Sequence, residues 1–178
     1  IGFLELNSIA KGIEAADAVI KAADVSLVFA KAGCPGKYYL LFSGEVSAVQ
    51  ASLDAGYAIG QSYVVDQCVI PRVHPQVIRA IGMTNPPEEA GAVGVMEFYS
   101  VTASIFGADT AVKAADVSLL DVRLGTGIGG KSFVILIGDV AAVTEAVRCG
   151  TRTTNADGML VSSVVIPNPS PELFNSLL

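Results

Sequence analysis

Tryptophan is absent from the chain, and histidine, cysteine and charged residues are few: one His, three Cys and 16% charged residues among 178. A lone histidine, His74, excludes a metal site built from several histidines, and no constellation for covalent or acid–base catalysis stands out. Three unevenly spaced cysteines do not form a disulfide framework, which favours a reducing compartment. No apolar run approaches the roughly 18 residues of a membrane-spanning helix, so no membrane partner is expected.

The charge balance is acidic and the apolar content is high. Eleven Lys and Arg face 17 Asp and Glu, and aromatic residues make up 7% of the chain. Acidic charge with few arginines and aromatics makes nucleic acid a poor candidate partner. An apolar content of 52% excludes intrinsic disorder. With so little charge, some apolar surface is expected to meet other subunits.

The chain is a tandem duplication. The heptapeptide Lys21–Leu27 recurs letter for letter as Lys113–Leu119, 92 residues later. Gly36-Lys37 pairs with Gly130-Lys131 at an offset of 94, so the second copy has gained two residues in the preceding loop. The predicted organisation is a first domain at 1–82, a linker at 83–92 and a second domain at 93–178.

Each copy is predicted to read strand, helix, strand, strand, helix, strand. Apolar residues recur at helical spacing after Ser8, a candidate N-cap, and Gly56 is a candidate end for the second helix. This βαββαβ order indicates an α/β (α+β) fold with ferredoxin-like antiparallel sheets and helices on one face. In the first copy we expect strands at 1–6, 25–30, 38–42 and 63–70, helices at 9–23 and from 46, and a short helix after Pro75.

The segment Gly125–Ser132 satisfies the phosphate-loop pattern G-x-x-x-x-G-K-[ST]. A true phosphate loop requires a helix directly afterwards, because the helix N-terminus helps to hold the phosphates. The residues that follow, Phe133–Ile137, are a short β-branched apolar run that indicates a strand. We therefore predict a glycine-rich turn between two adjacent strands, and nucleotide binding remains the weaker alternative.

In the first copy the corresponding loop contains a cysteine. Cys34-Pro35-Gly36-Lys37 has the residues of a type II turn, which would place the Cys34 thiol at the tip. One thiolate cannot hold a metal cluster, whereas three could if three chains met around a symmetry axis. The other cysteines are expected to be packing positions, since Cys68 is equivalent to Val164 and Cys149 to Ala55.

Two further pairs of residues recur in both copies. Glu5 and Glu97 are equivalent, which favours a structural role over a catalytic carboxylate pair. Lys21 and Lys113 lie near the end of the first helix of each copy. A cation there stabilises the helix dipole, and a repeated contact at a subunit edge is the alternative.

Long collinear segments of the chain resemble the tandem-domain shell proteins of bacterial microcompartments (BMC) over essentially the whole length. The resemblance implies a non-enzymatic, cytoplasmic protein in a microcompartment shell. It also implies a pseudohexameric homotrimer that contacts other shell proteins and has a central pore where the glycine-rich loops converge. The segments that show the resemblance are Ile1–Glu5, Ala15–Val25, Ser43–Val49, Val69–Pro75, Val93–Glu97, Ala108–Val117 and Gly138–Val140.

The resemblance also assigns residues to the pore and to the tile edge. The edge lysine of the family falls on Lys21 and Lys113, and the arginine after Ile-Pro falls on Arg72, where the second copy has Asn168. That difference implies that the six sides of the tile are not equivalent. The pore-lining residues would be Gly33, Pro35, Gly36, Lys37, Gly125, Thr126, Gly127, Ile128, Gly129 and Gly130.

Among tandem members, the chain is most similar to the type found in propanediol-utilisation compartments. That type implies a [4Fe-4S] cluster ligated by Cys34 of three chains, electron transfer across the shell and an encapsulated redox enzyme as a candidate partner. One alternative is a shell tile with an open metabolite pore that Cys34 merely lines. Another is a small-molecule-binding regulatory trimer, which would stay a discrete trimer in solution, whereas a shell tile would form sheets or arrays.

Overall fold

The computed structural model describes residues 1–82, 91–125 and 127–177, apart from the side chains of residues 153, 155 and 156. The predicted linker at 83–92 and Thr126 therefore lie largely or wholly outside the described residues. By their contacts the residues form two compact units. The first contains Ile1–Arg72 and Gly125–Gly130, and the second contains Val73–Leu124 and Lys131–Leu178.

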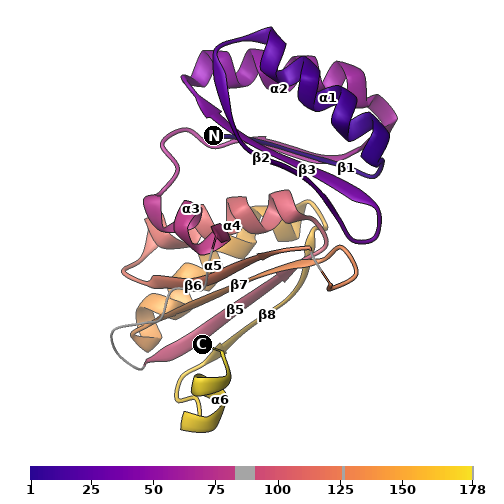
Figure 1. Cartoon of the computed structure of the whole chain (residues 1–178). Helices are drawn as coiled ribbons and strands as arrows, with labels where there is room; N and C mark the ends of the chain where they lie inside the picture. Colours follow the sequence, from indigo (N-terminus) through magenta and orange to yellow (C-terminus); the bar gives the residue numbers. More distant parts are fainter. Residues whose placement is uncertain (83–90, 126, 178) are drawn as a thin grey trace. The chain divides into compact units, whose positions relative to one another are not determined.

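The first unit is a four-stranded antiparallel sheet with two helices on one face (Figure 1). The strand order is β2-β3-β1-β4, so β2 and β4 are the edge strands. The order predicted from the sequence, βαββαβ, is confirmed. The elements are β1 (Gly2–Leu6), α1 (Ile9–Ala22), β2 (Val25–Gly33), β3 (Lys37–Gly44), α2 (Val46–Gly60), a 3₁₀ turn (Gln61–Tyr63) and β4 (Val64–Val69).

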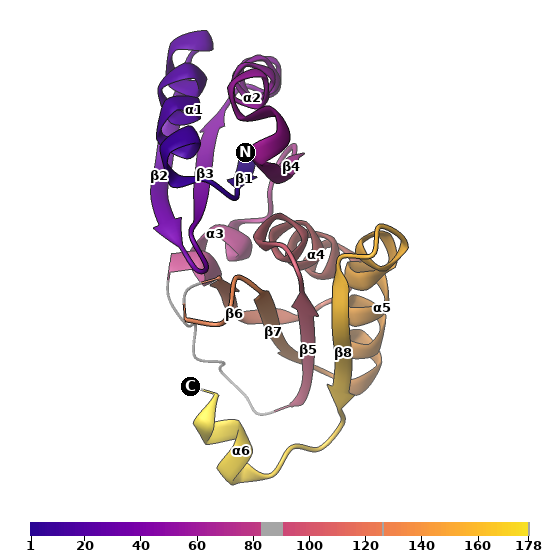
Figure 2. The same ribbon diagram turned by 90° about the vertical axis from the view of Figure 1, so that its right-hand side faces the viewer.

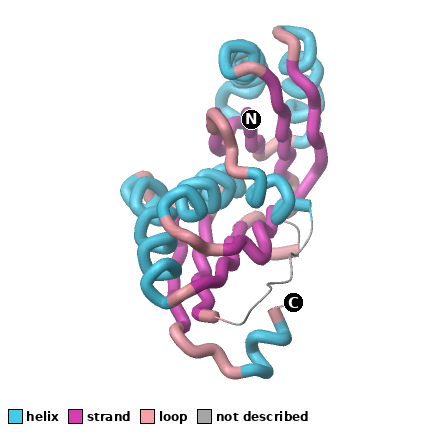
Figure 3. Tube along the Cα trace, turned by 90° about the vertical axis from the view of Figure 1, so that its left-hand side faces the viewer, coloured by secondary structure: helices cyan, strands magenta, loops and turns pink. Residues whose placement is uncertain are grey.

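The second unit repeats this plan with strand order β6-β7-β5-β8, and α4 and α5 cover one face of its sheet (Figure 2). It also contains two short helices, α3, which packs on β6, and α6. In Figure 3 the C-terminal helix α6 lies apart from the other helices of this unit. The elements are α3 (Pro75–Gly82), β5 (Ala92–Phe98), α4 (Val101–Ala114), β6 (Ser118–Leu124), β7 (Ser132–Gly138), α5 (Val140–Ala156), β8 (Leu160–Ile166) and α6 (Pro171–Ser176).

The core of the first unit forms where the sheet meets its two helices. Alternate residues of β1, Leu4 and Leu6, face α1 and α2, and Ala15 and Val19 of α1 pack against them. Ser8 caps α1 as predicted: its Oγ accepts a hydrogen bond from the backbone N–H of Lys11. The equivalent residue of the second unit, Ser100, caps α4 in the same way.

The predicted role of Gly56 as a helix end is wrong, because α2 continues to Gly60. A Cβ atom on Gly56 would lie 2.7 Å from Cγ2 of Val19 and 3.0 Å from Cδ2 of Leu4. The missing side chain lets α2 pack closely on α1 and on the sheet. Gly56 is thus a packing glycine inside the helix.

Candidate functional site: the Cys34 hairpin

Cys34 lies in the hairpin that joins β2 to β3. The backbone N–H of Gly36 donates to the carbonyl of Gly33 over 2.9 Å, which closes a turn over Gly33–Gly36. The Cys34–Pro35 peptide bond is cis, so this is a type VI turn. The predicted type II turn over Cys34–Lys37 is therefore wrong by one residue. Gly36 still has the positive φ, 96°, that glycine was expected to supply.

The Cys34 thiol is free and partly exposed, while Pro35 and Gly36 beside it are exposed. Within the described part of the chain, no group of three or more His, Cys, Asp or Glu side chains could hold a metal ion. One chain thus offers a single thiol at this hairpin. A cluster of the iron–sulfur type, which takes several thiolates, fits here only if more than one chain contributes its Cys34.

The side chain of Tyr39 binds the backbone of the hairpin. Its hydroxyl donates to the carbonyl of Cys34 over 3.3 Å. Burial, followed by the negative charge of Glu5 and then Cys34, raises the pKa of Tyr39 well above its ordinary value. The phenol therefore keeps its proton and stays a donor to the hairpin at any physiological pH.

Lys37 joins the hairpin to the second glycine-rich loop. Its Nζ donates to Oε1 of Glu5 over 2.6 Å and to the carbonyl of Gly130 over 3.1 Å. Gly130 belongs to the segment Gly125–Gly130, which packs with the first unit. A Cβ atom on Gly130 would lie 2.6 Å from Cδ of Pro35, so this contact requires glycine. The structure therefore brings together part of both loops that the family resemblance assigns to the pore.

The Glu5–Lys37 pair is almost completely removed from solvent. Glu5 is 0% exposed and the Lys37 side chain 14%, whereas the equivalent Lys131–Glu97 pair of the second copy is 44% and 33% exposed. The first pair joins β1 to β3, and the second joins β5 to the residue directly before β7, which agrees with the structural interpretation of Glu5 and Glu97. Sequence reasoning missed both pairs, although Lys37 and Lys131 were already matched by the repeat.

The second glycine-rich loop connects two strands directly. The strand β7 begins at Ser132, immediately after Lys131, so the helix that a phosphate loop requires does not follow. Gly127, Gly129 and Gly130 have φ values of 78°, 67° and 79°, which glycine adopts readily. The prediction of a turn between adjacent strands is confirmed, and the phosphate-loop alternative is contradicted.

The predicted edge residues lie on the surface. Lys21 and Lys113 occupy the last turns of α1 and α4, where they form i, i+4 ion pairs of 2.6 Å with Asp17 and 2.5 Å with Asp109. Arg72 is exposed in the turn after β4, with a φ of 49°. Their roles in contacts between tiles remain predictions.

Cys68 and Cys149 are less buried than packing positions would be. Cys68 is half-buried, and its equivalent Val164 is 48% exposed, so interchange with valine did not indicate a core site. The Cys149 thiol donates to Oε1 of Glu145 over 3.3 Å at the surface of α5. A hydrogen bond from Arg148 lowers the pKa of Glu145 to about 2, and the carboxylate in turn raises the pKa of the Cys149 thiol.

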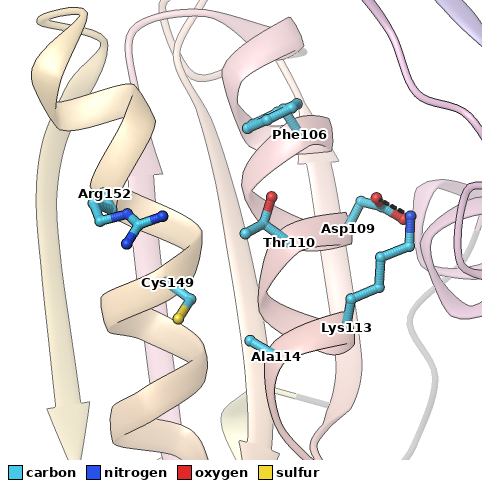
Figure 4. A pocket seen from close by; sticks show the side chains of 7 residues that line it. All are labelled: Phe106, Asp109, Thr110, Lys113, Ala114, Cys149 and Arg152. Carbon is cyan, nitrogen blue, oxygen red and sulfur yellow. Dashed lines mark hydrogen bonds and ion pairs between the residues drawn. The ribbon is translucent and has the colours of Figure 1, made fainter.

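A shallow depression of about 420 Å³ lies between α4 and α5 (Figure 4). The Lys113 side chain lies at its rim, bonded to Asp109, so the depression adjoins one of the predicted edge lysines. No general acid–base pair or nucleophile–base pair faces it among the lining residues. The lining residues are Phe106, Asp109, Thr110, Lys113, Ala114, Cys149 and Arg152.

Replacing Gly33 by alanine is expected to disturb the hairpin. A Cβ atom there would lie 2.1 Å from Cε2 of the fully buried Tyr39 ring, and such overpacking costs about 1–3 kcal/mol of unfolding free energy. Urea denaturation of Gly33→Ala measures the loss. Gly82→Ala is the control, because nothing lies within 4 Å of its added Cβ. Equal stability of both variants would contradict this prediction, because it would show that the Tyr39 ring can move away from the added Cβ atom without loss of stability.

Comparison with known proteins identifies the family. The BMC domain matches residues 1–73 and again residues 92–169, in agreement with the duplicated fold. The chain therefore belongs to the BMC-domain family. It is a tandem-domain shell protein of bacterial microcompartments, a structural rather than a catalytic class. In the described residues, no helix combines the length and the apolar character that crossing a membrane requires.

Relatives that match along the whole chain define its place in the family. It is 42% identical over 178 residues to the bacterial microcompartment shell protein PduT of Citrobacter freundii, covering 100% of this chain and 97% of PduT. A crystal structure of a microcompartment protein from Desulfitobacterium hafniense is 49% identical with a TM-score of 0.86, covering 98% of this chain and 97% of that one. The carboxysome assembly protein CcmO of Synechococcus elongatus is 26% identical, over 99% of this chain and 68% of CcmO.

Proposed function

We propose that the protein is a pseudohexameric homotrimeric shell tile whose central pore holds a [4Fe-4S] cluster, ligated by Cys34 of each of the three chains. The cluster would supply one-electron transfer across the shell. The observation that supports it is the free, partly exposed thiol of Cys34 in a hairpin braced against the second glycine-rich loop. The relationship to PduT along the whole chain is consistent with it.

The bracing contacts suit a ligand that must be held at a fixed place. Tyr39 holds the Cys34 carbonyl, and Lys37 holds the base of the hairpin against Glu5 and Gly130. Three chains provide three thiolates, so a fourth iron would bind water or another small ligand. Such a site would be accessible from solvent, suited to exchange electrons with a small carrier or an encapsulated redox enzyme. The edge residues Lys21, Lys113 and Arg72 would join the tile to other shell proteins.

The second candidate is a tile with an open metabolite pore in which Cys34 only lines the wall. The exposure of Pro35 and Gly36 beside the thiol is as compatible with an open pore as with a cluster, because an exposed loop can border an open channel. The two candidates differ in whether iron is present. Three thiolates around a cluster would obstruct metabolite flow through the same opening.

Iron and acid-labile sulfide in protein expressed anaerobically, with the EPR spectrum of the reduced protein, distinguish the candidates. A shared cluster predicts roughly four irons per trimer and their loss in Cys34→Ser. The matched controls are Cys68→Val and Cys149→Ala, which take the residue of the other copy and should keep the iron. A well-formed trimer without iron, even after reconstitution, would contradict the cluster and leave the open pore.

A further inference from the structure

The hydroxyl group of Tyr39 belongs to the copy that carries Cys34 and has no counterpart in the other copy. The repeat offset of 94 relates Tyr39 to Phe133, and in the strand pairing both residues lie opposite the glutamate that recurs in the two copies. The glycine-rich segment at 125–130, which corresponds to the Cys34 hairpin, contains no cysteine. The hydroxyl and the thiol therefore occur together in one copy and are both missing from the other.

Packing explains the ring of Tyr39 but not its hydroxyl. Tyr39 is 0% exposed, its ring is stacked on that of Phe3 with the centroids 6.3 Å apart, and its Cε2 atom lies beside Gly33. Phenylalanine would fill the same space without taking a polar group out of water, which is unfavourable unless the group is hydrogen-bonded. The second copy has phenylalanine at this position, so the fold itself does not require the hydroxyl.

The hydroxyl binds the backbone of the residue that carries the thiol. In the described part of the chain its partner is the carbonyl of Cys34, which accepts its hydrogen bond over 3.3 Å. Gly130 also approaches this carbonyl, because a Cβ atom there would lie 2.8 Å from the carbonyl oxygen. Burial, then Glu5 and then the negative charge of Cys34 raise the pKa of Tyr39, so the phenol also lies near enough to the thiolate to interact with its charge.

We propose that the Tyr39 hydroxyl is a positioning group for Cys34, which holds the hairpin of each chain in one arrangement before three thiolates meet at a cluster. This role rests on the [4Fe-4S] cluster proposed above. A hairpin that is already ordered loses little conformational freedom when its cysteine becomes a ligand, which favours ligation by three separate chains. The second copy supplies no cysteine, so phenylalanine is sufficient there.

The same hydroxyl is expected to act on the reduction potential. Hydrogen bonds and local charges around an iron–sulfur centre help to set its potential. An O–H dipole beside an anionic ligand stabilises the more negative, reduced form of the centre. Loss of the Tyr39 hydroxyl should therefore make the midpoint potential more negative.

Thiol labelling of iron-free protein tests the positioning role without the cluster. Cys68→Val and Cys149→Ala leave Cys34 as the one cysteine, and Tyr39→Phe is compared with this parent for the rate of alkylation by iodoacetamide. A net hydrogen bond contributes about 1 kcal/mol, which is about fivefold in an opening equilibrium, so Cys34 should react about fivefold faster in Tyr39→Phe. Tyr38→Phe is the matched control, because Tyr38 is the neighbouring, half-buried residue of β3 and its hydroxyl forms no hydrogen bond with the described residues.

Redox titration of the iron-loaded protein, followed by EPR, is the second measurement. Tyr39→Phe is expected to shift the midpoint potential to a more negative value, and Tyr38→Phe is expected to leave it unchanged. A residue that only fills space would not move the potential.

The outcomes separate the role of Tyr39 from the proposed function. An unchanged labelling rate in Tyr39→Phe would overturn the positioning role and leave the cluster standing. Wild-type protein without iron would overturn the cluster, and the labelling rate alone would then decide whether Tyr39 holds the Cys34 hairpin. A faster rate with an unchanged potential would keep the positioning role and remove the effect on the potential. Loss of the circular dichroism signal in Tyr39→Phe would assign the hydroxyl to the fold of the whole unit and would also overturn the positioning role.

Discussion

Glu5→Ala is expected to destabilise the first unit by about 3–5 kcal/mol, because it leaves the Lys37 ammonium group buried without its carboxylate. Glu5 is fully buried, and its Oε1 lies 2.6 Å from Nζ of Lys37. The Gly130 carbonyl, 3.1 Å from the same Nζ, is neutral and cannot replace the lost charge. Urea denaturation monitored by circular dichroism measures the change.

The second copy provides the control for this prediction. Glu97→Ala breaks the equivalent pair with Lys131, whose side chains are 33% and 44% exposed. Water can solvate the remaining ammonium group there, so the expected loss is at most about 1 kcal/mol. Similar losses for Glu5→Ala and Glu97→Ala would show that burial does not decide the cost of breaking the pair.

Replacing both Lys21 and Lys113 by alanine is expected to abolish two-dimensional arrays while leaving trimers intact. Both lysines are exposed at the ends of α1 and α4, and among the described residues their ion pairs lie within their own helices, with Asp17 and Asp109. The loss of a surface ion pair of this kind costs a folded chain less than about 1 kcal/mol. A strong effect on arrays would therefore report on contacts between tiles. Electron microscopy of concentrated protein, with light scattering on diluted samples, measures both states.

Lys11→Ala is the control for array formation. Lys11 is also an exposed lysine of α1 paired within its helix, with Glu14 at 2.7 Å, but it lies in the first turn. Arrays should survive in this variant. Arrays that persist in the Lys21→Ala, Lys113→Ala variant would show that the edge assignment is wrong.

The repeat made most of the fold predictable, because two copies had to satisfy the same pattern. Ser8 and Ser100 cap equivalent helices, and the run after Lys131 forms a strand as its counterpart after Lys37 does. Gly56 was misread because a glycine inside a helix resembles a helix end in sequence. Its actual reason, the approach of Val19 from another helix, is a contact between residues distant in the chain.

The position of the candidate site could be predicted from the sequence, but the contacts that hold the Cys34 hairpin in place could not. The sequence placed Cys34 in a glycine-bearing hairpin, but the isomer of the bond to Pro35, which shifts the turn by one residue, is not encoded in a local pattern. The contacts of Lys37 with Glu5 and Gly130 join residues 32 and 93 positions away, beyond the reach of local reasoning. The repeat alone could have suggested the Glu5–Lys37 pair, because both of its members recur.

The packing of α3 on β6 has a consequence for how dilution acts on an assembly of this protein. That interface is made by one continuous chain, so its two surfaces meet at an effective concentration fixed by the polypeptide and not by the amount of protein in solution. In the proposed homotrimer, the contact of α3 with β6 would already be complete in each chain once that chain has folded. Dilution would then act only on the contacts between chains, and a homotrimer of duplicated chains would need three bodies to meet where single-copy chains would need six.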